Sequence, residues 1–372
     1  MIKKIPTTQI VLAFMLPFVL SCKFIPQMSS TIKTTLSPQG NARIADTYRK
    51  YVEARNHGLQ MGCSTKDMVK ASAILTTPET PNPKKRILIQ GFGPFSVGKP
   101  NISGVVAATL GNPKTWRDSE SIANPLGTPG ETENGQPDDL AARALQRTLT
   151  YNGISYEICS VITEILWDFT PAVVLYEASQ FQPDLIIMSG RGTLNNVLRF
   201  EVGAINRAVS LSGYDENGNM FPVDEKPERA LILPEKNGVN GTIQMSWHPQ
   251  QIVEHIGPAL KFLADSFGKT QQTNVQKNAD PNNTYICNNV SFIVLNALKN
   301  IPLELAGGLL AIQPQIAKPV SAGFLHYPVN APVDSKNAYA WGHVMMNIIE
   351  SEITIEKNAE PKSPYNNPNI QH

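Results

Sequence analysis

The sequence predicts an α/β protein with three layers, in which helices cover both faces of a largely parallel, mixed central sheet. Short apolar runs of the strand type occur at residues 86–90, 156–162 and 184–188. Helical patterns at residues 103–110 and 172–181 lie between them. Strands that alternate with helices in this way are typical of right-handed β-α-β units, whose strands pair in parallel.

Each of these elements has a local reason. The first strand is an apolar run that ends at Gly91, where a turn can follow. Before the second helix, Thr170 is a good N-cap residue, and Pro171 suits the first helical position because no N–H is needed there. Val173 and Val174 supply the apolar contacts of this helix.

The chain is predicted to contain one catalytic domain, at residues 86–352. Residues 23–85 are polar and rich in proline at their end, and we expect a tether with one helix, at residues 42–59, and a linker. Residues 353–372 are rich in Asn, Pro and Lys and are predicted to form a disordered tail.

Residues 1–22 have the pattern of a lipoprotein signal peptide. Two early lysines precede an apolar stretch at residues 10–20, which is too short to span a bilayer as a helix and ends in a serine and Cys22. This pattern predicts an exported protein, lipidated at Cys22 and anchored in the cell envelope, in the periplasm or at the outer membrane. An ordinary secretory signal is the alternative, because Leu20 stands where a small residue is usual.

The number of cysteines leaves one thiol without an obvious partner. Of the four cysteines, lipidation of Cys22 leaves Cys63, Cys159 and Cys287. An odd number leaves one thiol free or paired between chains, and a Cys63–Cys159 disulfide is one arrangement that the sequence leaves open. The sequence has no CxxC, no HExxH and no Cys/His cluster with ligand spacing, so we expect no metal. The formal net charge of +1 gives no reason to expect a nucleic-acid partner.

Cys287 is the candidate nucleophile. Val290, Val294 and Leu298 follow it at a spacing of four, which predicts a helix that begins at or just after the cysteine. Unpaired N–H groups at a helix N-terminus stabilise a thiolate, so we expect the pKa of Cys287 to be lowered. The alternative is a small buried residue with no chemical role.

A nucleophilic cysteine needs a base, and the base needs an orienting group. His326 ends a short apolar run and is predicted to lie at a strand end, where an imidazole is accessible. Glu201 sits within another apolar run, where a charge needs a partner. Each residue has a structural alternative, and spacing along the chain does not pair them.

The loop after the first strand, GFGPF at residues 91–95, lacks the glycine pattern of a phosphate-binding loop. Its aromatic residues, Phe92 and Phe95, instead suggest an apolar wall for a small flat ligand. Packing of both rings into the core is the alternative.

Taken together, these segments resemble the pyroglutamyl peptidase I (pyrrolidone-carboxylate peptidase) family of cysteine peptidases. The likeness runs from about residue 86 to residue 352, and its motifs occur in the family's order: GFGPF at 91–95 with Asn101 behind it, EVGAIN at 201–206, DENG at 215–218 with PVDE at 222–225, TYICN at 284–288 and GFLHYP at 323–328. Any one of these motifs is weak, whereas all of them in one order are specific.

The resemblance implies a triad in which Cys287 attacks, His326 is the base and then the acid, and Glu201 orients the imidazole. It implies hydrolysis of the amide that follows an N-terminal pyroglutamate on a peptide, through a thioester. It places Phe92, Phe95 and Asn101 at the substrate, needs no cofactor and allows a homo-oligomer.

This chain also departs from the family, which is shorter and usually cytosolic. It has added polar segments at residues 112–137 and 229–246, and the turn at residues 190–196 follows the family's glycine-rich version only loosely. Two alternatives therefore stay open: a related thiol amidase with another small acyl-amide substrate, and an envelope lipoprotein that binds a partner through a vestigial site. The retained Glu, His and Cys argue against the second.

Overall fold

The computed structural model describes residues 38–58, 62–65, 84–94, 101–111, 141–209, 229–235, 239–283 and 285–359. These residues belong to one compact unit, Thr34–His372. The signal peptide with Cys22, the substrate-loop residue Phe95 and the added segment at 112–137 lie outside the described residues.

The centre of this unit is a seven-stranded sheet with the order β10-β5-β13-β4-β1-β3-β2. Its strands are β1 (Lys85–Phe92), β2 (Ala142–Tyr151), β3 (Ile154–Thr163), β4 (Leu185–Arg191), β5 (Val197–Phe200), β10 (Gln272–Val275) and β13 (Ser321–Tyr327). β13, β4, β1 and β3 pair in parallel, whereas β2 is antiparallel to β3 and β5 to β13. The predicted α/β class with a largely parallel, mixed sheet is confirmed.

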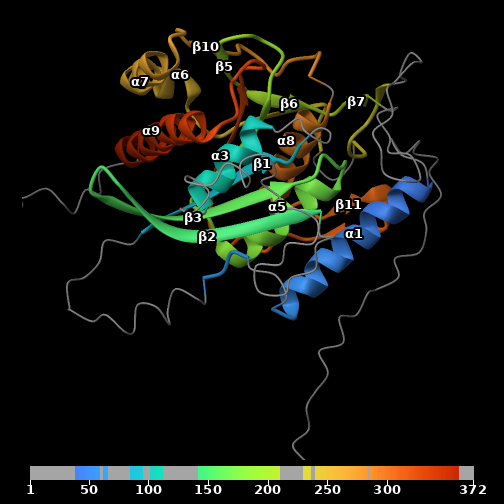
Figure 1. Cartoon of the computed structure of the whole chain (residues 1–372). Coiled ribbons are helices and arrows are strands. Elements are labelled where there is room, and N and C mark those ends of the chain that lie inside the picture. Colours follow the sequence, from blue (N-terminus) through green and yellow to red (C-terminus); the bar gives the residue numbers. More distant parts are fainter. Residues whose placement is uncertain are drawn as a thin grey trace, which may run out of the picture. The chain divides into compact units, whose positions relative to one another are not determined.

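Helices pack on both faces of this sheet (Figure 1). One face carries α3 (Ile102–Gly111), α6 (Pro249–His255), α7 (Gly257–Phe267) and α9 (Ser335–Ala359), and the other carries α1 (Pro38–Asn56), α5 (Phe169–Phe181) and α8 (Ile286–Ala297). Neighbouring strand residues serve opposite cores: Ile87 and Ile89 face the α3 side, and Leu88 faces the α5 side.

Short elements complete the unit outside the sheet. β6 (Gly203–Ile205) pairs with β9 (Thr242–Gln244), β7 (Ala208–Val209) with β8 (Arg229–Ala230), and β11 (Leu303–Leu305) with β12 (Leu310–Ile312), and the 3-10 turn η1 (Ala306–Gly308) joins the last two. The predicted insertion at 229–246 therefore supplies β8 and β9, and β9 pairs with the strand that follows Glu201.

Two local predictions need correction. Helix α5 begins at Phe169, and Thr170 is inside its first turn, where its hydroxyl donates to the carbonyl oxygen of Leu166 at 3.2 Å, so Thr170 is not the N-cap. The disordered tail was placed too early, because α9 continues through Ala359 and its Ile353 and Ile355 pack against the core.

The part of the chain that we interpreted as a tether is attached to the α/β unit. In α1, the Tyr51 hydroxyl donates to Glu177 at 2.8 Å and the Arg55 guanidinium pairs with the same carboxylate at 2.7 Å. Beyond the helix, Cys63 forms a disulfide with Cys159 of β3. Glu177 is fully buried in α5, so these contacts hold the segment before the first strand against the sheet.

We expect the Cys63–Cys159 disulfide to contribute a large share of the stability. It closes a loop across a sequence separation of 96, for which restriction of the unfolded chain predicts about 4–5 kcal/mol. The double variant Cys63→Ala/Cys159→Ala should therefore lower the urea midpoint strongly, without changing Cys287. An unchanged midpoint would mean that the network around Glu177 alone fastens the segment.

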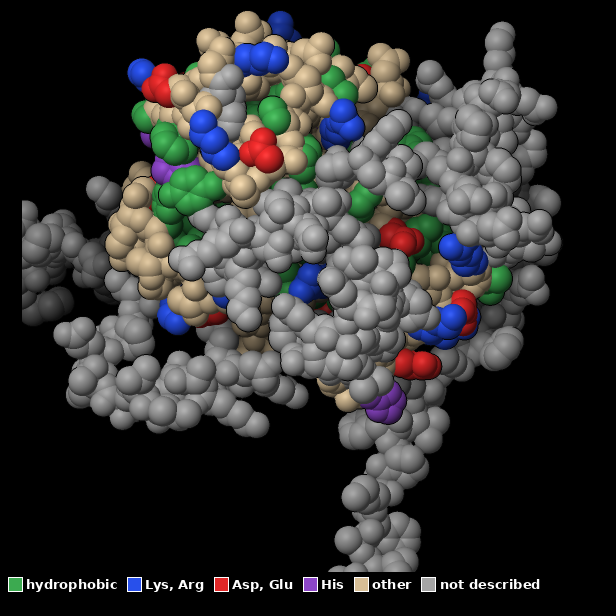
Figure 2. Space-filling view, viewed as in Figure 1, with side chains coloured by type: hydrophobic (Ala, Val, Ile, Leu, Met, Phe, Trp, Pro, Cys, Tyr) green, Lys and Arg blue, Asp and Glu red, His purple; other side chains and the backbone are tan. Residues whose placement is uncertain are grey.

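No described helix combines the length and the apolarity that crossing a bilayer requires. On the face shown in Figure 2, the described basic and acidic side chains are intermingled, in agreement with the formal net charge of +1.

Candidate active site

The site lies where β4 and β13 end and α8 begins. Because β13 and β4 are parallel, His326 lies beside Gly190 in the sheet. β5 runs antiparallel to β13, so Glu201, which follows β5, returns alongside Phe324 and its N–H donates to the Phe324 carbonyl oxygen at 3.0 Å. The topology thus brings residues 190–201 together with His326 and with the start of α8.

Glu201 and His326 form a buried pair. Oε1 of Glu201 is 3.0 Å from Nδ1 of His326, and the two residues are only 1% and 8% exposed. With the proton on Nδ1 bonded to the carboxylate, Nε2 of the imidazole is left as the base. The expectation that Glu201 orients His326 therefore has a geometric basis.

Three further residues hold Glu201, and the sequence reasoning missed all of them. The Trp247 indole N–H donates to the Glu201 carbonyl oxygen at 2.8 Å. Nη2 of Arg199 lies 3.4 Å from Oε1 of Glu201. The Gln276 carboxamide lies between Arg199 and Glu201: its nitrogen can donate to Oε2 of Glu201, and its oxygen can accept from Nε of Arg199 at 2.9 Å. The only signal for this set in the sequence is Arg199, a charge two residues before Glu201 in the same apolar run.

Arg199 is itself fixed by a second carboxylate, that of Asp280, at 2.5 Å. Burial raises the pKa of Asp280, but hydrogen bonds from the Asn282 backbone N–H and from Arg199 outweigh it, so the pKa is lowered overall. Asp280 is therefore ionised at neutral pH and shares the arginine with Glu201.

Cys287 is the second residue of α8, as predicted for a cysteine at a helix N-terminus. The neighbouring Asn288 anchors the start of this helix, because its side chain accepts from the Ile205 N–H and donates to the carbonyl oxygens of Ile205 and Arg207, each at 2.9 Å. Cys287 is the free cysteine among the described residues. Its sulfur is thus placed by a helix that is tied to the strand after Glu201.

The state of this thiol differs from the expectation. Burial of the sulfur and, to a smaller degree, the charge of Glu201 raise the pKa of Cys287 to about 12, although a hydrogen bond from its own N–H acts in the opposite direction. Burial therefore outweighs the helix N-terminus. The resting group is a neutral thiol, so nucleophilic attack requires removal of its proton.

Cys287 and His326 both line a cavity of about 270 Å³. Its polar lining includes Arg191, Arg199 and Asp280, and the turn after β4 contributes Thr193 and Leu194. A cavity of this size admits a small acyl group, and both the thiol and the imidazole are among the groups that line it.

Of the predicted substrate residues, Phe92 and Asn101 are described, and neither of them lines this cavity. Phe92 is 1% exposed and packs next to Gly190. Asn101 is buried and caps α3, because its Oδ1 accepts from the Ser103 N–H at 3.1 Å and from the Ser103 hydroxyl at 2.9 Å. Its Nδ2 has no hydrogen-bond partner among the described residues. A role for Phe92 or Asn101 at the substrate stays a prediction.

Gly190 makes room for the nucleophile. A Cβ at this position would lie 2.8 Å from the Cys287 sulfur and 3.2 Å from the Phe324 ring. Gly190→Ala should therefore displace the sulfur and lower kcat by about 10–100-fold, the cost of a misplaced reacting atom. The measurement is kcat together with the rate of alkylation of Cys287. Gly257→Ala at the start of α7, where an added Cβ meets nothing within 4 Å, is the matched control. Equal effects of the two substitutions would contradict the steric argument.

One group of possible metal ligands occurs among the described residues: Cys63, Cys159 and Glu177. Its two sulfurs are joined in the disulfide, and its carboxylate is shared by Tyr51, Arg55 and the Cys63 N–H. The two sulfurs and the carboxylate are thus already used in contacts that attach the N-terminal segment to the α/β unit.

No protein-family model and no curated protein sequence matches this chain. Among solved structures, it is similar to pyroglutamyl peptidase I from Bacillus amyloliquefaciens, with 16% identity, 72% of this chain and 95% of that chain covered, and a TM-score of 0.41. It is also similar to pyrrolidone carboxyl peptidase from Thermococcus litoralis, with 17% identity, 75% and 99% covered, and a TM-score of 0.41. A mutant pyrrolidone carboxyl peptidase from the hyperthermophile Pyrococcus furiosus shares 15% identity over 73% and 99% of the chains, with a TM-score of 0.42. We therefore infer the activity of this chain from its own residues.

Proposed function

We propose that this protein is a cysteine peptidase that removes N-terminal pyroglutamate from peptides. The observation that carries the proposal is the buried Glu201–His326 pair, whose His326 lines the same cavity as the free thiol of Cys287. This is the arrangement of nucleophile, base and orienting group that covalent hydrolysis needs. The pyroglutamyl group is proposed from the sequence motifs around Phe92, Cys287 and His326.

The mechanism starts from the neutral thiol. Nε2 of His326 takes the proton from the Cys287 sulfur as the sulfur attacks the acyl carbonyl carbon of the substrate. The carbonyl oxygen becomes an oxyanion, and the N–H groups of the first turn of α8 are available to stabilise it. The imidazolium stays paired with Glu201, so the charge formed by the proton transfer is compensated inside the protein.

The intermediate then collapses in the reverse sense. The C–N bond breaks, the leaving amine takes the proton from His326, and the acyl group remains on the sulfur as a thioester. A water molecule gives its proton to His326 and attacks the thioester carbon. The C–S bond breaks, the sulfur regains a proton from His326, and free pyroglutamate is released.

The test is hydrolysis of pyroglutamyl-7-amino-4-methylcoumarin by the purified protein in a mild reductant. Glutamyl, prolyl and acetyl derivatives of the same fluorophore serve as matched substrates. We expect the pyroglutamyl compound to give the highest kcat/KM. A higher value for another acyl group would replace the proposal by that of a related thiol amidase, and no turnover of any derivative by folded protein would favour a binding role.

We also propose that the protein is exported and held at the cell envelope by lipid on Cys22. The signal-type sequence of residues 1–22 supports this, as does the Cys63–Cys159 disulfide, since structural disulfides persist in oxidising compartments. Cys22→Ser should release the protein from the membrane fraction, with Cys63 and Cys159 still paired. Unchanged fractionation of this variant would rule out the lipid anchor.

A further inference from the structure

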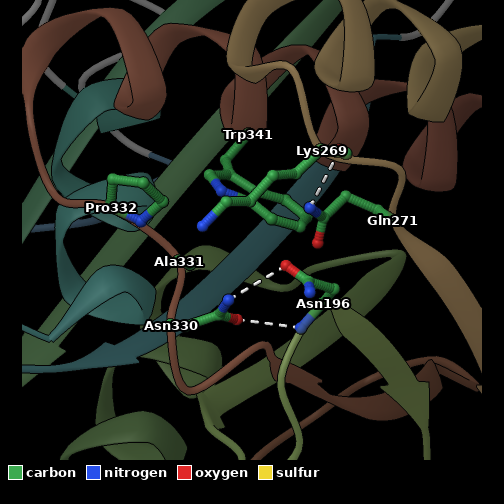
Figure 3. A pocket seen from close by; sticks show the side chains of 7 residues that line it. All are labelled: Asn196, Lys269, Gln271, Asn330, Ala331, Pro332 and Trp341. Carbon is green, nitrogen blue, oxygen red and sulfur yellow. Dashed lines mark hydrogen bonds between the residues drawn. The ribbon is translucent and has the colours of Figure 1, made fainter.

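A second cavity has a volume of about 180 Å³ (Figure 3). The ring of Trp341 and Pro332 form an apolar side, and its polar lining consists of Asn196, Asn330, Lys269 and Gln271. The two cavities share no lining residue, but the turn at residues 192–197 contributes to both of them. This cavity is therefore distinct from the candidate active site and adjacent to it.

Two polar atoms of this cavity have no hydrogen-bond partner among the described residues. One is the indole N–H of Trp341, a residue that is only 1% exposed, and the other is Oε1 of Gln271. A buried donor or acceptor without a partner is costly, and each such group in a folded protein calls for an explanation. The cavity volume is several times the roughly 30 Å³ that one water molecule takes up in the liquid, so a single water does not fill it.

The other amide groups of the cavity are already engaged. Nδ2 of Asn330 donates to Oδ1 of Asn196 at 2.9 Å, and the Asn196 backbone N–H donates to Oδ1 of Asn330 at 2.8 Å (Figure 3). Nε2 of Gln271 donates to the Lys269 carbonyl oxygen at 3.2 Å. These bonds hold the wall in place, while the Trp341 N–H and Oε1 of Gln271 stay without a partner among the described residues.

A cation is also available, because the exposed Lys269 lines the cavity. A carboxylate satisfies both this group and the Trp341 N–H, because it accepts hydrogen bonds on two oxygens. The Gln271 oxygen requires an N–H donor on the same ligand. Pro332 and the indole ring take the short carbon skeleton that joins the two.

We propose that this cavity binds a small carboxylate that carries an N–H donor a few bonds away, the class that includes N-acyl amino acids, lactam acids and the C-terminal residue of a peptide. The carboxylate contacts Trp341 Nε1 and Lys269, and the N–H donates to Gln271 Oε1. The proposal concerns binding alone and does not depend on the peptidase activity.

The test is a titration of the full chain, ¹⁵N-labelled at its tryptophan indoles, with N-acetylglycine. The chain has four tryptophans, and the indole signal that is absent from the Trp341→Phe variant belongs to Trp341. We expect that signal to shift and saturate with N-acetylglycine. Acetate and N-methylacetamide should each bind at least about tenfold more weakly, because acetate lacks the N–H for Gln271 and N-methylacetamide lacks the carboxylate for Trp341 and Lys269.

Variants separate this site from general anion binding. Lys269→Met should raise the Kd for N-acetylglycine at least about tenfold, whereas Lys261→Met, at an exposed lysine of α7 that pairs with Asp265, should leave it unchanged. Calorimetry with Trp341→Phe should show a similar loss, and its thermal unfolding reports whether the ring of the new residue still packs on Tyr327. A Trp341 signal that does not move, or that moves equally with sodium chloride, would overturn the proposal.

Discussion

Replacement of Cys287 by alanine is expected to lower kcat for pyroglutamyl-7-amino-4-methylcoumarin by at least about 10⁴-fold, because loss of the nucleophile in a triad removes nearly all of the covalent chemistry. The fold should survive, because only the sulfur is lost, at the edge of a cavity that already exists. The measurement is the initial rate of fluorophore release, with circular dichroism of both proteins to compare their folding.

The matched control for this variant is the native protein treated with iodoacetamide. Prolonged alkylation at high pH should inactivate it in step with modification of Cys287, since Cys63 and Cys159 are paired and lipid is expected on Cys22. Retained turnover in folded Cys287→Ala protein would show that another group attacks the substrate, and the triad assignment would then be abandoned.

Glu201→Gln should have the second-largest effect, a fall in kcat of roughly 10²–10⁴-fold. The glutamine has the shape of the native side chain but carries no charge, and its amide can donate to Nδ1 of His326, which then holds the proton on the wrong nitrogen. The pair is almost fully buried, so water does not replace the lost carboxylate. The measurement is kcat and KM across pH 5–9, in which kcat should fall far more than KM rises.

The control is Glu254→Gln, which removes an equal charge from an exposed position of α6. That variant should keep the native kcat. If Glu201→Gln also kept kcat within about threefold, Glu201 would be a structural partner of Arg199 and Gln276 and would not orient the base.

Those strands of the sheet whose own sequence has a strand pattern could be predicted. The runs at 86–90, 156–162 and 184–188 became β1, β3 and β4 because strands buried on both faces are mostly apolar along their length. Strand β2 was missed, although Asn152 and Gly153 both have positive φ and form the two-residue turn of the β2–β3 hairpin. An Asn-Gly pair between two strand-like runs is a recognised signal for this turn.

For the site, the sequence indicated residue types, and the topology brings them together. Glu201 and His326 are 125 residues apart, and they meet only because β5 turns back antiparallel to β13. The contacts of Glu201 with Trp247, Arg199 and Gln276 depend on the same antiparallel pairing, so no local sequence pattern predicts them. The pKa of Cys287 was mispredicted for a related reason, because a helix N-terminus can be read from a sequence but the depth of burial cannot.

The raised pKa of Cys287 also bears on how long the enzyme would last outside the cytoplasm. Peroxide and disulfides react with a thiolate, and sulfur held as a thiol reacts slowly with either. If the proposed export holds, a protein that keeps Cys63 and Cys159 oxidised would keep Cys287 reduced in the same compartment, because burial holds its sulfur as a neutral thiol. Burial of Cys287 would then lower the reactivity of the resting sulfur and slow its inactivation by oxidation.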